Sequence, residues 1–287
     1  MKISVVIGTY NQAETLQLAL ESYCNQTLAA NDFELIVVDS SSTDGTESVV
    51  KSLKLPYYLN YLKVENKGKS FARNQGIKQA KTDLIFLTDA DIVADCALLA
   101  RHIAGHNKQV VIEGAEYNLK KILNISELSP TNPNIYPCIQ QKLKLGQKLK
   151  WSYFLSGNLS LPKKLFEEAG GFDEQFSVYG WEDIELGYRL AKMRVPLIYD
   201  PAAINYHFHF VSGQDMVKRK YNMGKSAAYF YKKHPNFEIK MYLGMNPLAM
   251  GIFYLLKTFP KLKELLNNQY INEEYSYRLG LTEDLKA

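Results

Sequence analysis

Two hydrophobic patterns alternate along the first hundred residues. Continuous apolar runs rich in Val, Ile and Leu are typical of buried parallel strands, while apolar residues spaced three and four apart are typical of helices with one buried face. The predicted strands are residues 3–8, 33–38, 57–64 and 84–88, and the predicted helices start near residue 12 and cover residues 46–53 and 70–80. Strands that alternate with helices predict an α/β fold with a doubly wound, mostly parallel sheet.

The first predicted helix has a start signal. Asn11 is the expected N-cap, and Glu14 follows three residues later at capping-box spacing. Leu16, Leu20 and Tyr23 then share one face. We therefore expect this helix to pack its apolar side on the sheet.

The second half of the chain is less regular. Asn, Pro and Lys accumulate over residues 117–150, which predicts a long surface excursion, and order returns at 151–160 and in a helix at 163–169. We expect a main domain over residues 1–235, with halves 1–115 and 151–235, and a helical C-terminal extension over 236–287.

Composition and charge narrow the class of protein. Of 287 residues, 46% are hydrophobic and 22% are charged, as in ordinary globular proteins. The net charge of +4 is mild and the Lys and Arg residues are scattered, so no nucleic-acid partner is expected. Cys24, Cys96 and Cys138 lack the spacing of a zinc site or disulfide framework, which favours a cytoplasmic protein.

Polar residues follow three successive predicted strands: Thr9, Asp39 and Asp89. In open α/β sheets, ligands bind beyond the carboxyl ends of the strands. Asp89 and Asp91 are also spaced as a carboxylate pair, which suits a hard cation such as Mg²⁺ or Mn²⁺ that takes phosphate oxygens as its remaining ligands. Such a cation would neutralise a departing diphosphate.

A second candidate site is the segment Gly180-Trp181-Glu182-Asp183. Leu186 and Leu190 follow at helical spacing, so the two acids should open a helix. Acids are favoured at a helix N-terminus in any protein. The preceding glycine and tryptophan instead favour a cleft, in which Asp183 would act as a general base.

A third candidate is His207-Phe208-His209-Phe210. In a strand both histidines would share one face, and histidines at this spacing can bind a metal. The alternative is a half-buried strand that simply exposes its histidines to solvent.

Taken together, these motifs resemble the family-2 inverting glycosyltransferases, which have the GT-A fold. The similarity covers roughly residues 2–230 and includes residues 6–11, 37–46, Thr88-Asp89-Ala90-Asp91, Gly170-Gly171-Phe172-Asp173 and Trp181-Glu182-Asp183. The last motif resembles the C-terminal segment of chondroitin polymerases and polypeptide N-acetylgalactosaminyltransferases.

The resemblance implies a role for each matching position. Residues 1–115 would bind the nucleotide and residues 151–235 the acceptor. Asp183 would be the general base, with Glu182 beside it orienting a sugar. The implied donor-nucleotide contacts are Thr9, Tyr10, Asn11, Glu14, Asp39, Lys69, Arg73 and Asp89; the implied sugar and acceptor contacts are Gly157, Asn158, Trp181 and Glu182; and the implied ligands of Mn²⁺ or Mg²⁺ are Asp91, Asp89 and His207, with His209 as a substitute.

The function implied is metal-dependent, inverting transfer of a sugar from a nucleotide-sugar donor, usually linked to UDP, to a glycan or lipid-linked acceptor. No Q-x-x-R-W sequence is present, so a single transfer per encounter is expected rather than processive polysaccharide synthesis. A sugar nucleotidyltransferase would need a glycine-rich loop that Gly8-Thr9-Tyr10-Asn11 does not provide. A sugar-binding subunit without catalysis would be expected to have lost one of the acids.

The C-terminal segment leaves two interpretations open. Residues 241–263 combine an apolar stretch with Lys257, Lys261 and Lys263. They could form an interfacial helix at the inner face of the cell membrane. Alternatively, the stretch packs on the domain or forms a dimer contact.

Overall fold

The computed structural model describes residues 1–121, 123–137, 143–208, 213–266 and 268–286. The chain forms two compact units. The sheet unit comprises residues 1–174 and 183–210, and the helical unit comprises residues 175–182 and 211–287. The long segment of the helical unit thus begins at residue 211, whereas the C-terminal extension was expected to begin at residue 236.

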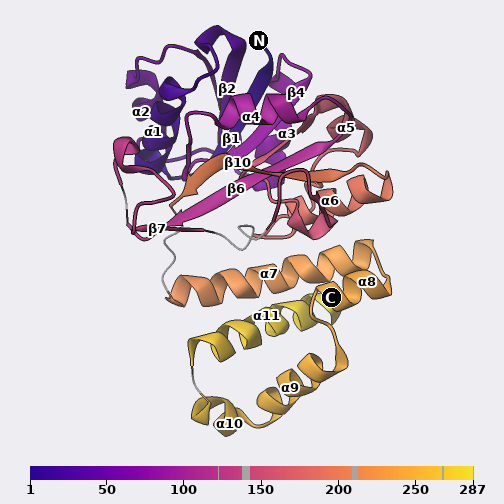
Figure 1. Ribbon diagram of the computed structural model, residues 1–287. Helices are drawn as coiled ribbons and strands as arrows, with labels where there is room; N and C mark the ends of the chain where they lie inside the picture. Colours follow the sequence, from indigo (N-terminus) through magenta and orange to yellow (C-terminus); the bar gives the residue numbers. More distant parts are fainter. Residues whose placement is uncertain (122, 138–142, 209–212, 267, 287) are drawn as a thin grey trace. The chain divides into compact units, whose positions relative to one another are not determined.

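The first half of the sheet unit alternates strands and helices as expected (Figure 1). The elements are β1 (Ile3–Thr9), α1 (Ala13–Ser22), β2 (Phe33–Asp39), α2 (Thr46–Ser52), β3 (Tyr58–Lys63), α3 (Lys69–Gln79) and β4 (Leu84–Asp89), with short 3₁₀ helices η1 (Tyr23–Asn25) and η2 (Ala30–Asp32). Strands β3, β2, β1 and β4 pair in parallel in that order.

The second half adds strands of both directions. Its elements are β5 (Ile92–Ala94), α4 (Leu98–Gly105), β6 (Val111–Leu119), η3 (Ile125–Glu127), β7 (Ile135–Pro137), β8 (Lys148–Leu149), η5 (Trp151–Tyr153), β9 (Leu159–Pro162), α5 (Lys163–Glu168), α6 (Glu182–Lys192) and β10 (Leu197–His207). Strand β9 lies antiparallel between β4 and β6, and β6 pairs in parallel with β10. The α/β class is confirmed, in a mixed ten-stranded sheet whose N-terminal half is parallel.

The sheet carries hydrophobic core on both faces. Because neighbouring strand residues point to opposite faces, Val6 of β1 packs in the cluster that contains Ile77 of α3, whereas Val5 packs in the cluster that contains Leu16 of α1. Helices α3, α5 and α6 cover the first face, and α1, α2 and α4 cover the other. Burial on both faces explains why these strands are continuously apolar.

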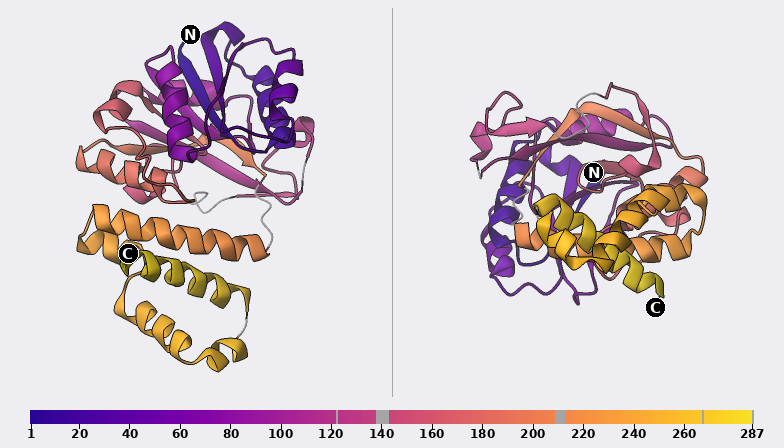
Figure 2. Two further views of the ribbon diagram at one scale, coloured as in Figure 1. Left: turned by 180° about the vertical axis from the view of Figure 1, so that it is seen from behind. Right: turned by 90° about the horizontal axis from the view of Figure 1, so that it is seen from below.

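The helical unit consists of α7 (Gly213–Lys233), α8 (Phe237–Tyr242), α9 (Pro247–Thr258), α10 (Pro260–Leu265) and α11 (Gln269–Lys286). Helices α7 and α11 run side by side, with α9 and α10 on the side of α11 away from α7 (Figures 1 and 2). Two glycines allow the close approach of α7 and α11. A Cβ on Gly224 would lie 1.9 Å from the Tyr277 carbonyl oxygen, and one on Gly280 would lie 2.1 Å from that of Tyr221.

The expected N-cap of the first helix is wrong. Asn11 has a left-handed backbone (φ 51°), and α1 starts at Ala13 with Gln12 as its N-cap. The Asp44 carboxylate accepts the Ala13 N–H at 2.9 Å and so caps this helix from the neighbouring loop. A distant residue therefore provides the cap that sequence spacing had assigned to Asn11.

Candidate active site

The parallel strands bring their polar ends to one edge of the sheet. Thr9 is the register partner of Asp39, and Gly8 is the partner of Asp89. The expectation that Thr9, Asp39 and Asp89 leave the sheet at the same edge is confirmed. Their side chains nevertheless make different contacts there.

Asp39 organises the loop after β2. Its side chain is fully buried, Oδ1 accepts the Ser42 N–H at 2.8 Å and the Ser42 hydroxyl at 2.5 Å, and Oδ2 accepts the Tyr61 hydroxyl. With both oxygens used inside the protein, Asp39 fixes loop geometry in this conformation. Its expected direct contact with a nucleobase stays a prediction.

The loops after β1 and β2 are joined to each other. Asn11 Oδ1 accepts the Thr43 N–H at 2.8 Å, and the Asn11 N–H donates to Ser42 Oγ at 2.8 Å. Next to this junction the Tyr10 ring is half exposed and Glu14 is exposed. The Tyr10 ring of the joined loops and the Glu14 carboxylate in the first turn of α1 thus face solvent. Thr9 is buried, with no hydrogen-bond partner for its hydroxyl among the described residues.

Asp89 is held by two cations from α3. Lys69 Nζ lies 3.0 Å from Oδ2 and Arg73 Nη2 lies 2.7 Å from Oδ1. Burial alone would raise the pKa of Asp89, but the attraction of Lys69 and Arg73 outweighs it and holds the pKa of this carboxyl well below its ordinary value. The structure therefore brings together three of the predicted residues. Because both Asp89 oxygens meet a cation, this conformation does not support Asp89 as a metal ligand.

Asp91, His207 and Glu116 form a second cluster at the same edge. His207 Nε2 lies 3.4 Å from Asp91 Oδ2, and His207 Nδ1 lies 3.1 Å from Glu116 Oε1. Strand pairing sets this up, because His207 of β10 is the partner of both Ile92 in β5 and Asn118 in β6. The Phe208 N–H also donates to the Asp91 carbonyl at 2.9 Å.

The carboxylates of Asp91 and Glu116 determine the pKa of the His207 imidazole. Burial would lower the pKa of His207, but the hydrogen bonds to Asp91 and Glu116 raise it to about 10. Glu116 was missed by the sequence argument. Its only local signal is an acid three residues before the end of β6, which does not reveal that β10 brings a histidine beside it.

The donor set of this cluster fits a hard divalent cation. A carboxylate oxygen and an imidazole nitrogen bound to one ion at about 2.1 Å each lie roughly 3–4 Å apart, and Asp91 and His207 meet that spacing. Among the described residues, no group of three or more His, Cys, Asp or Glu side chains is placed to hold a metal ion. Within the described residues this cluster thus offers two ligands, Asp91 and His207. His209 lies outside the described residues.

A short loop before β9 contacts three carboxylates in succession. The Leu155 N–H donates to Glu113 Oε2 at 3.3 Å, and the Ser156 N–H and hydroxyl donate to Asp183 Oδ2 at 3.4 and 3.3 Å. Gly157 lies against Glu116, since a Cβ there would be 3.1 Å from Oε2. This loop links Asp183 to the cluster of Asp91, His207 and Glu116.

Asp183 lies in the first turn of α6, as predicted, and is half-buried. Its Oδ1 accepts the Ile184 N–H at 2.8 Å. Glu182, directly before it, is buried and is counted with the helical unit. Trp181 has a left-handed backbone (φ 73°), and its indole N–H donates to the Met223 carbonyl at 2.8 Å within the helical unit.

Asn158 has a structural role in this conformation. Its side chain is buried, Nδ2 donates to the carbonyls of Ala115 and Ala203, and Oδ1 meets His102 Nε2 at 2.9 Å. The Asn158 amide therefore connects β6 to β10. The prediction had been that this side chain lines a sugar pocket.

Glu113 is a second acid that the sequence argument missed. It lies inside β6 and is fully buried. Burial raises the pKa of Glu113 well above its ordinary value, and the negative charges of Glu116 and Asp183 add to this effect, although the Leu155 N–H opposes it. Glu116 and Asp183 thus act on Glu113 by direct charge repulsion.

Comparison with known proteins identifies the family. Residues 4–168, more than half of the chain, match the model described as glycosyl transferase family 2. Residues 140–212 match the model described as the N-terminal domain of galactosyltransferase. The two matches together cover the sheet unit from β1 to the end of β10.

Several curated proteins are similar in sequence. Validoxylamine A glucosyltransferase from Streptomyces hygroscopicus subsp. jinggangensis is 32% identical over 231 residues, covering 68% of this chain and 52% of that protein. The uncharacterized glycosyltransferase YfnE from Bacillus subtilis is 29% identical over 238 residues (66% and 60%), and chondroitin synthase from Escherichia coli is 25% identical over 274 residues (82% and 40%). The chain spans about half the length of the curated relatives it matches.

Solved structures show the same fold. The mannosyltransferase PcManGT from Pyrobaculum calidifontis, in complex with GDP-Man and Mn²⁺, superposes with a TM-score of 0.64 at 18% identity, covering 99% of this chain and 85% of that one. S. aureus TarS 1-349 in complex with UDP gives a TM-score of 0.59 at 19% identity, covering 99% and 91%. The expected GT-A architecture is confirmed, and the chain belongs to glycosyl transferase family 2.

Proposed function

We propose that the chain is a metal-dependent inverting glycosyltransferase. It would move one sugar per encounter from a nucleotide-sugar donor, with UDP as the nucleotide, to a hydroxyl of a glycan or lipid-linked acceptor. The observation that carries the proposal is the loop at 155–157, which joins Asp183 to the cluster of Asp91, His207 and Glu116. A base for the acceptor and ligands for a diphosphate-bound cation are the two groups that this chemistry needs.

Each part of the donor has residues suited to it. The half-exposed Tyr10 ring can stack on the base, beside the joined loops after β1 and β2. Lys69 and Arg73 bring positive charge to the strand ends, and Asp89 orients both. A structural neighbour was solved with UDP and another with GDP-Man and Mn²⁺, which supports a nucleotide diphosphate at this edge.

Asp91 and His207 would hold Mn²⁺ or Mg²⁺, and Glu116 would orient His207 through Nδ1. When bound, the cation would supply Lewis-acid neutralisation of the leaving diphosphate.

The transfer itself uses Asp183. The acceptor oxygen forms its bond to the anomeric carbon from the face opposite the diphosphate, so the configuration inverts. The bond between that carbon and the diphosphate oxygen breaks, and its electron pair leaves with the diphosphate. The acceptor proton moves to the Asp183 carboxylate, which Ser156 holds in place. Alignment of the acceptor hydroxyl with the anomeric carbon of the donor lowers the barrier further.

The test separates binding from turnover. Calorimetry should show UDP binding that requires Mn²⁺, and Asp91→Ala should abolish it, whereas Asp83→Ala at the opposite end of β4 should not change it. Asp183→Asn should keep UDP binding yet lose on the order of a hundredfold or more in turnover of the sugar nucleotide.

The product identifies the reaction. Screening sugar nucleotides with Mn²⁺ should release UDP and, without an acceptor, free sugar. Formation of UTP and sugar 1-phosphate when pyrophosphate is added would indicate a nucleotidyltransferase instead. UDP affinity that is unchanged in Asp91→Ala would refute the metal assignment, and an active Asp183→Asn enzyme would remove Asp183 as the base.

A further inference from the structure

The helix α9 is strongly apolar, yet most of it is not covered. Of its side chains only Phe253 and Leu256 are buried. Leu248, Ile252, Leu255 and the following Phe259 are 75%, 51%, 48% and 57% exposed. Their spacing of four, three and four residues places them on one face of the helix. We call these four side chains the α9 stripe.

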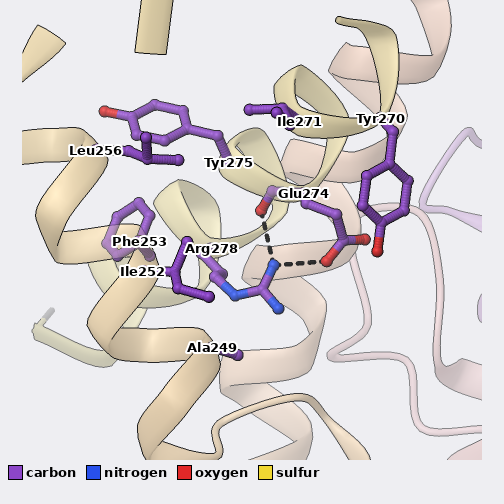
Figure 3. A pocket seen from close by; sticks show the side chains of 9 residues that line it. All are labelled: Ala249, Ile252, Phe253, Leu256, Tyr270, Ile271, Glu274, Tyr275 and Arg278. Carbon is purple, nitrogen blue, oxygen red and sulfur yellow. Dashed lines mark hydrogen bonds and ion pairs between the residues drawn. The ribbon is translucent and has the colours of Figure 1, made fainter. Parts of the chain in front are cut away.

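The stripe continues into a larger apolar surface of the helical unit. Leu265 of α10 and Tyr270 of α11 are also strongly exposed. Between α9 and α11 lies a cavity of about 180 Å³, lined mainly by apolar side chains of the two helices (Figure 3). Ile252 and Tyr270 belong to both the cavity wall and the exposed surface. Helix α9 therefore packs only partly on α11, and the described residues leave the stripe exposed.

The charges around the stripe indicate what covers it. Helices α9 and α10 have three lysines (Lys257, Lys261 and Lys263) and one acid (Glu264). A second copy of the same surface would bring these like charges together, which disfavours association. An exposed apolar face bordered by lysines and aromatic residues is the pattern of a helix that lies in the interface of an anionic membrane.

We propose that the α9 stripe binds the surface of a lipid bilayer that contains anionic phospholipids. The stripe side chains would enter the boundary between headgroups and acyl chains, and Lys257 and Lys261 would meet lipid phosphates. Within the described ranges, every helix is too short or too polar to cross a bilayer. The proposal stands independently of the transfer reaction.

Vesicle binding tests the proposal directly. The whole chain should co-sediment with vesicles of phosphatidylcholine and phosphatidylglycerol and bind at least tenfold more weakly to vesicles of phosphatidylcholine alone. The double variant Ile252→Asn/Leu255→Asn should lose binding at least tenfold, because both side chains lie in the stripe. Leu145→Asn, at a strongly exposed position of the sheet unit, is the matched control and should bind normally.

A second variant isolates the charge. Lys257→Gln/Lys261→Gln should weaken binding severalfold on anionic vesicles, and added salt should reduce the difference from the unaltered chain. Circular dichroism checks that the variants, all at exposed positions, keep their fold. Absence of vesicle binding would overturn the proposal. So would self-association in light scattering that Ile252→Asn/Leu255→Asn removes while vesicles bind nothing, since the occupant would then be a second copy.

Discussion

Glu116 shows how much a single side chain depends on its neighbours for a role. It is one of two acids in strand β6, and at that level it has no evident function. In the folded chain, however, Glu116 Oε1 accepts a hydrogen bond from His207 Nδ1, and His207 Nε2 faces Asp91. Carboxylates that bond the second nitrogen of a metal-binding histidine fix the ring and strengthen the ligand. Under the proposed function, Glu116 is a positioning residue.

Replacing Glu116 by Gln should therefore weaken Mn²⁺ binding in the presence of UDP by roughly 10–100-fold. The glutamine carbonyl can still accept from Nδ1, but the negative charge is lost. Calorimetric titration of Mn²⁺ measures the effect without relying on turnover. Glu65→Gln, at an exposed surface pair with Lys67, is the control and should titrate like the unaltered chain. An unchanged Mn²⁺ affinity in Glu116→Gln would contradict the positioning role.

Other residues show the opposite outcome, in which a polar side chain predicted to face a ligand is used inside the protein. Asp39 and Asn158 are both polar, and both lie where strands end or begin, so sequence position alone favours ligand contact. The structure buries both: Asp39 accepts from Ser42 in its own loop and from Tyr61 of β3, and Asn158 donates to carbonyls of β6 and β10. Sequence cannot distinguish these uses, because it does not show which donors fold back onto a given oxygen.

At the scale of elements, the strands and helices of the sheet unit follow from local pattern. The predicted strands at 3–8, 33–38 and 84–88 are each extended by one residue in the structure, and the helix at 182 begins where its acids indicated. The antiparallel insertion of β9 between β4 and β6 does not follow from local pattern, since strand direction depends on long-range pairing. The close packing of α7 on α11 is likewise visible only in three dimensions.

The glycine contacts between α7 and α11 predict that replacing one of these glycines by alanine lowers the stability of the protein. Gly→Ala inside a helix ordinarily stabilises a protein by about 0.5–1 kcal/mol. Gly224→Ala should instead destabilise by about 3 kcal/mol, because the new methyl group would overlap the Tyr277 carbonyl and force the helices apart. Urea unfolding followed by circular dichroism measures this change.

Gly251→Ala in α9 is the matched control, because a Cβ there meets nothing within 4 Å. It should be neutral or stabilising. If Gly224→Ala were equally well tolerated, α7 and α11 would not be packed as closely as the structure shows.

At the scale of the whole molecule, buried histidines set part of the dependence of stability on pH. His102 and His106 share Ser160, whose Oγ lies 2.8 Å from His102 Nδ1 and 2.7 Å from His106 Nε2. Burial lowers the pKa of each from 6.5 to about 4. Between pH 4 and 6.5 the unfolded chain therefore binds protons at these sites that the folded chain does not.

Their contribution to stability is thus complete above about pH 6.5 and declines as the pH falls toward 4. The loss is about 3 kcal/mol for a fully buried histidine such as His102. His102→Gln should make the unfolding free energy depend less steeply on pH across this window, as measured by urea unfolding at several pH values. Ser160→Ala should lower stability at every pH but keep the slope, because the histidines stay buried. A slope unaffected by His102→Gln would contradict this assignment.

The sequence by itself determined the alternation of strands and helices, the placement of Asp89 and Asp91 at a strand end, and the acids that open α6. These are properties of short segments, since hydrophobic period and end signals act over a few residues. Only the tertiary structure decided that Glu116 lies beside His207, that Asp39 points into its own loop, and that the α9 stripe stays uncovered. Glu116 and the α9 stripe depend on segments far apart in the chain meeting, or failing to meet, and no local pattern encodes that. Asp39 combines a contact with Ser42, three residues away, and one with Tyr61 of β3, which only the pairing of β2 with β3 brings near.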